Sequence, residues 1–228
     1  MSNLSLSSES ISTLNSEEED YEDHPQHEAS SRSGSFTSIG SDDSTGEKKA
    51  AADFYHEASA SIFDALQKGQ NPDNIQIELK GLTLSSNAEG KQVRRSVAVG
   101  MMKQVATLVE SGSTPQQAVT KTIPPNKLLV EKCVLDQNDD DKTEQVEFLL
   151  FMQTDLVHRK AGEKILLFAC NALATNDLVE AEGFEQWWED PRSSASEELL
   201  QVRKETQPLV EALVGDSDEE DSDESESE

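Results

Sequence analysis

The sequence predicts an all-α fold of about eight or nine antiparallel helices arranged as hairpins. Apolar residues recur three and four positions apart along most of the central region, as they do on one face of a helix. Alternating apolar runs are few, and the central region has no Asp-Gly hairpin turns. The connecting segments are short, so a solenoid of the HEAT kind and a compact bundle both fit this pattern.

Composition divides the chain into three regions. The 228 residues carry a net charge of −27. Residues 1–50 are rich in serine and acidic residues and poor in large apolar ones, so we expect a disordered linker there. Residues 51–214 are expected to form one helical domain. Residues 215–228 contain mostly Asp, Glu and Ser, and we expect a disordered acidic tail.

The first half of the domain contains five expected helices. The first covers residues 53–68 and stops at Gly69, and the second begins at Asn71-Pro72 with a cap followed by proline. A strand over residues 75–79 competes with the second helix, because Ile75, Ile77 and Leu79 alternate. The third covers residues 88–110. Shorter helices are expected after Thr114-Pro115 and over residues 126–136.

The second half begins after an expected acidic loop at residues 138–141. Helices are expected over residues 143–159 and 162–174, and the latter is apolar nearly all round, as a central buried helix is. A short helix over residues 177–188 ends in two tryptophans. The last helix is expected to open with the capping pattern from Ser194 to Glu197 and to bend or break at Pro208.

Several classes of protein find no support in the sequence. No apolar run reaches the ~20 residues that span a bilayer, and the acidity disfavours binding to nucleic acid. We find no phosphate-binding glycine loop, no His-Glu-x-x-His and no nucleophile elbow, so we expect no catalytic chemistry and no cofactor. Cys133 and Cys170 lie in apolar stretches and are expected to be buried free thiols.

The most informative segment contains both tryptophans of the chain, Trp187 and Trp188, among carboxylates. Adjacent positions on a helix point about 100° apart, so one ring is expected in the core and the other nearer the surface. An exposed indole among acidic side chains attracts lysine through charge and cation–π contact. Two core tryptophans within an ordinary acidic helix are the alternative.

Two segments then resemble a known family. Residues 184–190, followed by a capped helix ending in residues 209–213 and an acidic tail, resemble the paired aromatic/acidic boxes of a W2 domain, which closes a few translation initiation factors. Residues 77–87, Ile-Glu-Leu-Lys-Gly-Leu-Thr-Leu-Ser-Ser-Asn, resemble a segment of the epsilon-subunit family of eukaryotic translation initiation factor 2B. The helix at residues 54–69 is similar as well, so the resemblance covers residues 53–228.

The resemblance implies a HEAT-like exchange domain that acts in the cytosol without covalent chemistry. It implies release of GDP from translation initiation factor 2, with Glu78 and Asn87 as the residues that act in exchange at the G domain of the gamma subunit. The boxes are expected to bind lysine-rich segments of the beta subunit. The residues implied for that contact are Trp187, Trp188, Glu185, Glu189, Asp190, Glu211, Asp216, Asp218, Glu219 and Glu220.

The chain also departs from this family. Lys80 stands where the family usually has asparagine, and the nucleotidyltransferase-like and β-helical parts of an epsilon subunit are absent. We therefore expect a monomeric fragment, with contacts to other subunits made by domains outside it. A W2-type adaptor that binds basic segments without exchange is the alternative, because adaptors need not carry the Glu78–Asn87 segment. A histone-binding acidic protein is a third reading, which rests on the tail alone.

Overall fold

A computed structural model describes residues 44–135 and 142–217 of the chain, with side chains for 51–135 and 142–215. Within these ranges all regular structure is helical, which confirms the all-α prediction and excludes the alternative strand at residues 75–79. The α-helices are α1 (Ser44–Gln67), α2 (Pro72–Ser86), α3 (Gly90–Glu110), α4 (Pro115–Thr122), α5 (Lys127–Cys133), α6 (Thr143–Leu156), α7 (Gly162–Thr175), α8 (Ala181–Glu189), α9 (Glu197–Arg203) and α10 (Gln207–Ser217). Three short 3₁₀-helices lie between them, at η1 (Pro124–Asn126), η2 (Pro191–Ser194) and η3 (Lys204–Thr206).

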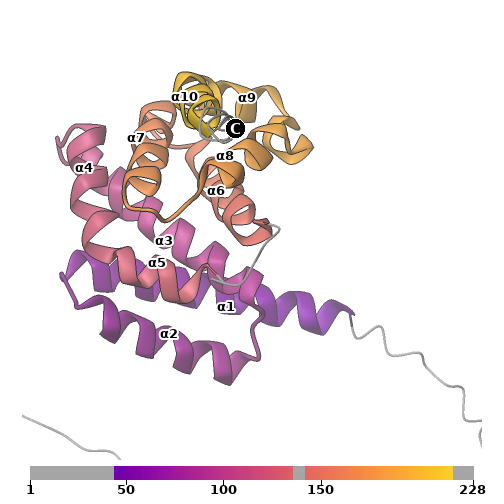
Figure 1. Cartoon of the computed structure of the whole chain (residues 1–228). Coiled ribbons are helices and arrows are strands. Elements are labelled where there is room, and N and C mark those ends of the chain that lie inside the picture. The colour runs from indigo at the N-terminus through magenta and orange to yellow at the C-terminus, as the bar shows by residue number, and fades with distance from the viewer. Residues whose placement is uncertain (1–43, 136–141, 218–228) are drawn as a thin grey trace, which may run out of the picture. The chain divides into compact units, whose positions relative to one another are not determined.

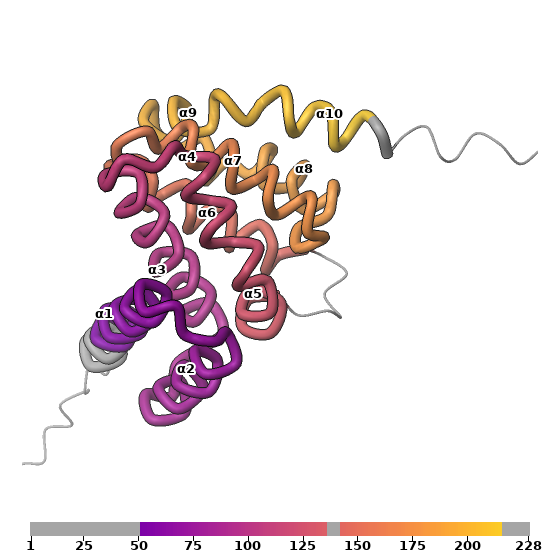
Figure 2. The backbone as a smooth tube through the Cα atoms, turned by 90° about the vertical axis from the view of Figure 1, so that its left-hand side faces the viewer, coloured from indigo at the N-terminus to yellow at the C-terminus, as the bar shows by residue number. Residues whose placement is uncertain are grey.

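The helices form a stack of two layers (Figures 1 and 2). In one layer α1, α3, α6, α8 and α10 follow one another, and each packs against the next. In the other layer α2 packs on α5, and α4 packs on α7, which packs on α9. This succession of neighbouring contacts is the HEAT-like stack of helical hairpins that the sequence predicted.

A continuous apolar core runs between the layers. Its largest fully buried side chains include Trp187, Phe148 and Phe184. Helices α1 and α3 approach closely at Gly100 of α3, where an added Cβ would lie 2.8 Å from Cγ2 of Ile62 on α1. Only glycine allows α1 and α3 to pack at this separation, so this position sets the start of the stack.

The helix boundaries differ from prediction mainly in the last helix. The cap of α9 is Ser196, whose hydroxyl accepts a hydrogen bond from the backbone N–H of Leu199 at 3.2 Å. The expected cap, Ser194, lies instead in η2, which begins at a proline and is capped by Asp190. The break expected near Pro208 is η3, and the proline itself occupies the first turn of α10, where its missing N–H costs nothing.

Some predicted features lie outside the described residues. These are most of the expected N-terminal linker, the acidic loop at 138–141 and the tail from residue 218. Helix α1 begins at Ser44, earlier than the expected position 53. None of the helices in the described ranges has the length and apolar character needed to cross a membrane.

Candidate functional site

Glu78 lies on the exposed surface of α2, in the first hairpin of the stack. Its Oε1 accepts a hydrogen bond of 2.5 Å from the hydroxyl of Ser61 on α1, so the carboxylate is held at the edge between the two helices. Two large apolar side chains on the same helix are strongly exposed, Ile77 at 69% and Leu84 at 84%. The exposed surface of α2 thus carries one positioned carboxylate and two large apolar side chains.

Asn87 occupies the cap at the C-terminal end of α2. Its φ of 50° places it in the left-handed region, and its backbone N–H donates to the carbonyl oxygen of Thr83. Asparagine tolerates this conformation better than most residues, which accounts for its position here on structural grounds. Glu78 and Asn87 are nine residues apart, or about 13 Å along a helix axis, so the structure does not bring them into one cluster.

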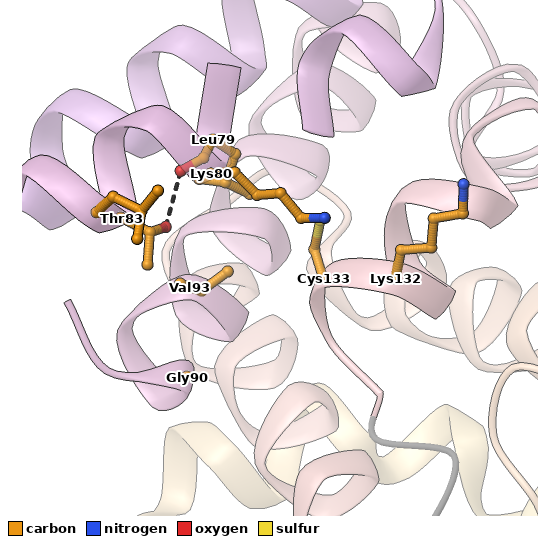
Figure 3. A pocket seen from close by; sticks show the side chains of 8 residues that line it. Leu79, Lys80, Thr83, Gly90, Val93, Lys132 and Cys133 are labelled. Atoms are coloured by element: carbon orange, nitrogen blue, oxygen red, sulfur yellow. Dashed lines mark hydrogen bonds between the residues drawn. The ribbon is translucent and has the colours of Figure 1, made fainter. Parts of the chain in front are cut away.

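A pocket of about 370 Å³ lies beside α2, and sequence analysis gave no sign of it. Leu79, Thr83 and Val93 contribute to its apolar wall, and Lys80 and Lys132 add two ammonium groups. Figure 3 shows Lys80 extending from α2 toward Cys133, and the hydrogen bond from the Thr83 hydroxyl to the Leu79 carbonyl oxygen. Burial raises the pKa of the Cys133 thiol, and the two lysines oppose that rise.

The two tryptophans of α8 have different surroundings. Trp187 has no exposed surface, and its Nε1–H donates to Oε1 of Gln153 on α6 at 3.0 Å. Trp188 is half-buried and meets Trp187 edge to face, with 5.9 Å between the ring centroids. The expected division between one core ring and one ring nearer the surface is therefore present, but direct contact of a partner with Trp187 would require the helix to unpack.

The face of Trp188 already has a cation. The guanidinium carbon of Arg203, on α9, lies 4.3 Å from the centroid of the Trp188 ring. The same guanidinium donates to the Trp188 carbonyl oxygen at 2.7 Å and to the hydroxyl of Ser193. Sequence analysis assigned this position to a lysine of a partner and missed Arg203, because fifteen residues separate it from Trp188.

The carboxylates near the tryptophans differ in exposure and in whether a cation of the same chain is paired with them. Asp190 accepts three hydrogen bonds from the guanidinium of Arg192, and these side-chain bonds lower the pKa of Asp190 below its usual range. Glu182, Glu185 and Glu189 are all exposed. They lie three and four positions apart on α8, so they share one face of the helix. We call these three residues the acidic face of α8.

The remaining predicted site residues belong to the end of the chain. Glu211 is exposed on α10, which packs against α8, and it accepts a hydrogen bond from the side chain of Gln207 at 2.7 Å. Asp216 lies in α10, but its side chain is not described. Asp218, Glu219 and Glu220 lie outside the described residues. Among the residues whose side chains are described, no cluster of three potential metal ligands occurs.

Comparison with known proteins finds a family that is similar to the C-terminal part of the chain. Residues 144–224 match the family model W2, described as eIF4-gamma/eIF5/eIF2-epsilon. This match begins in α6 and includes the tryptophan pair and the acidic face of α8.

One curated relative is similar over a longer range. The chain is 28% identical over 190 residues to translation initiation factor eIF2B subunit epsilon of Schizosaccharomyces pombe. The match covers 83% of this chain but only 26% of that protein, so the chain spans about a quarter of the length of its relative. Together the two findings confirm the resemblance to the C-terminal W2 region of an eIF2B epsilon subunit.

Proposed function

We propose that this chain is a guanine nucleotide exchange region that promotes GDP release from translation initiation factor 2. The observation that carries the proposal is the extent of the similarity to the epsilon subunit. A match over 83% of the chain necessarily includes α2 as well as α8, whereas the W2 match begins only at residue 144. The segment that distinguishes an exchange factor from an adaptor therefore lies within the aligned range. Such a role places the chain in the cytosol.

In this proposal α2 acts on the G domain of the gamma subunit. An exchange factor binds the nucleotide-free G protein more tightly than the GDP-bound form, and linkage requires GDP affinity to fall by the same factor. A coupling of ~3 kcal/mol weakens GDP binding about 150-fold. Glu78 is accessible and positioned by Ser61, so its carboxylate is available to compete for Mg²⁺ or for a basic residue that holds phosphate. The exposed Ile77, next to Glu78 in the sequence, and the exposed Leu84 farther along α2 supply apolar contact area.

The exchange step is tested by release of fluorescent GDP from translation initiation factor 2. The full chain is expected to accelerate release, and Glu78→Ala is expected to remove about tenfold or more of that acceleration, the loss of a charged contact worth ~1.5–3 kcal/mol. Glu110→Ala, which removes an exposed carboxylate at the end of α3, serves as the matched control. Release at the unstimulated rate with the intact chain overturns the proposal, and an unchanged rate with Glu78→Ala removes Glu78 from it.

The second proposed contact is with lysine-rich segments of the beta subunit. The acidic face of α8 projects from a helix that Trp187 anchors in the core, and Glu211 lies on the neighbouring helix. We assign Trp187 to positioning rather than contact. Trp188 is half-buried and keeps some surface for a partner, and Asp218, Glu219 and Glu220 continue the negative charge along the sequence. Contacts of this kind raise association rates and are screened by salt over ~8 Å at physiological strength.

A salt series distinguishes this electrostatic contact from an apolar one. Binding of a lysine-rich beta-subunit segment is expected to weaken steeply from about 50 to about 300 mM salt. Changing Glu182, Glu185 and Glu189 to Gln is expected to weaken it about tenfold at low salt, from exposed pairs worth up to ~1 kcal/mol each. The control changes Glu57, Asp64 and Glu110 to amides, which alters net charge equally but lies on α1 and α3. Binding that is indifferent to salt contradicts the contact.

A second candidate function is that of a W2-type adaptor. The matching family is described by two other initiation factors besides the epsilon subunit, which is the observation in its favour. An adaptor binds the basic segments through the acidic face of α8 but leaves GDP release unchanged. The two assays above separate the functions, because docking with no acceleration of release identifies the adaptor.

A further inference from the structure

The pocket beside α2 is formed by three helices (Figure 3). Helix α2 provides one side of it. Gly90 and Val93, at the start of α3, form the second side, and Lys132 and Cys133, at the end of α5, form the third. Its volume of about 370 Å³ lies within the range of ~300–1,000 Å³ that is typical of small-molecule sites.

This pocket lies on a different side of α2 from the carboxylate of the proposed function. Lys80 lines the pocket, and Glu78 does not. The two residues are two positions apart, which separates their directions by about 200° around the helix axis. A ligand in the pocket therefore need not displace the contact between Glu78 and Ser61.

The walls of the pocket are mainly apolar. Leu79 and Val93 are both buried, and Leu84 lines the pocket as an exposed side chain. The hydroxyl of Thr83 already donates to the carbonyl oxygen of Leu79 at 2.7 Å, so this hydrogen is not free for a ligand. A hydrocarbon group placed here leaves water for an apolar surface, which is favourable.

Lys80 supplies an unpaired positive charge at this pocket. It is exposed, and it forms no ion pair with any side chain that the structure describes. The ammonium of Lys132, by contrast, lies 3.5 Å from the carboxylate of Asp73. Both lysines line the pocket, whereas no acidic side chain is among its described lining residues. The ammonium of Lys80 is therefore available to one anionic group.

We propose that this pocket binds a small monocarboxylate with a compact hydrocarbon body, whose carboxylate pairs with Lys80. One unpaired cation matches one negative charge. The net charge of −27 repels a multiply charged anion, such as a phosphate ester, more strongly than a singly charged one. The apolar walls receive the hydrocarbon. The volume and the three-sided wall suit a free small molecule, and the site is independent of nucleotide exchange.

Protection of Cys133 from alkylation tests the site in the full chain. Cys133 lines the pocket and is partly exposed, whereas Cys170 has no exposed surface, so iodoacetamide reports on Cys133 while the protein is folded. The probe is phenylbutyrate, and we expect it to slow labelling of Cys133 about fivefold or more at saturation. Phenylbutanamide lacks the charge and acetate lacks the hydrocarbon, so each is expected to need at least about tenfold more for half-protection, the loss of a contact to a charged group.

Three lysine variants identify the cation. Lys80→Met keeps a side chain of similar length without its charge, and it is expected to raise the half-protection concentration of phenylbutyrate about fivefold or more. Lys132→Met is expected to change it less than about twofold, because Lys132 is already paired with Asp73. Lys121→Met, on α4, is the matched control and is expected to have no effect. All three side chains are exposed, so the variants keep the fold, which circular dichroism verifies.

Four results overturn the proposal. They are an absence of protection by phenylbutyrate, equal protection by phenylbutanamide, an unchanged half-protection concentration in Lys80→Met, and stronger protection by the capped peptide acetyl-Ala-Phe-Glu-Ala-amide. The last result would assign the pocket to a segment of a protein. None of these measurements uses a G protein, so their failure and a failure of the proposed exchange function are distinguishable.

Discussion

Gln153 joins three elements of the C-terminal half from a position with no exposed surface. Its amide nitrogen donates to the carbonyl oxygens of Ser193 at 2.8 Å and Leu199 at 2.9 Å. Its amide oxygen accepts from Nε1–H of Trp187. One side chain on α6 thus fixes α8, η2 and α9, the elements around the acidic face of α8. We predict that Gln153→Leu, which keeps the volume similar but removes all three hydrogen bonds, destabilises the protein severely.

The magnitude follows from the groups left without a partner. An unpaired buried donor or acceptor costs ~1–3 kcal/mol, and the substitution removes the acceptor of the buried Trp187 indole N–H. The two carbonyls lose one bond each, so the expected total is ~3–5 kcal/mol. That is a large share of the ~5–15 kcal/mol that stabilises a typical domain. With a urea slope of ~2 kcal/mol per molar, the unfolding midpoint falls by ~2 M.

Urea unfolding followed by far-ultraviolet circular dichroism measures this loss. The control is Gln207→Leu, which removes an exposed glutamine bonded only to the exposed Glu211 and is expected to change stability by less than ~0.5 kcal/mol. If Gln153→Leu lies within ~1 kcal/mol of the unaltered chain, the hydrogen bonds of Gln153 do not hold these helices together, and our account of how the site is positioned fails.

Three further predictions concern stability and reactivity. Gly162→Ala is expected to cost at least ~1–3 kcal/mol in urea unfolding, because its Cβ would lie 2.2 Å from the last carbonyl oxygen of α6. Glu147 and Asp190 have lowered pKa values in the folded state. The stabilisation that they provide is therefore present above the unfolded carboxyl pKa of ~4 and is lost as the pH falls through the folded values. Melting temperatures should decline from pH 7 to pH 3, and they should decline less steeply in Glu147→Gln. Burial raises the pKa of both thiols, and Cys170 has no exposed surface, so a thiol reagent at neutral pH should label Cys133 slowly and Cys170 only after unfolding.

Sequence patterns predicted the helices better than the contacts of their side chains. Helical spacing and proline positions placed α2, α4 and the break before α10, because these depend on neighbours within one turn. The cap at Ser196 was misplaced by two residues, since the preceding η2 uses Ser194 and the local pattern fits both serines.

The candidate site was predictable only in part for a similar reason. Helix geometry predicted that Trp187 and Trp188 would face different surroundings. No local rule reveals that Arg203 covers Trp188, or that Gln153 lies in the core amid apolar neighbours, since both contacts join residues distant in sequence. The cavities around Phe151 escaped sequence analysis because the residues that line them come from separate helices, far apart in the sequence.

The order of contacts in the stack has a consequence for how forces spread through the molecule. Helix α2 touches α1 and α5 at one end, whereas α8 touches α6 and α10 near the other. In such nearest-neighbour architectures, each unit loosens or tightens mainly with the units beside it. A force applied at the last hairpin is therefore expected to bend the stack by small movements between neighbouring helices. The first hairpin keeps its internal geometry.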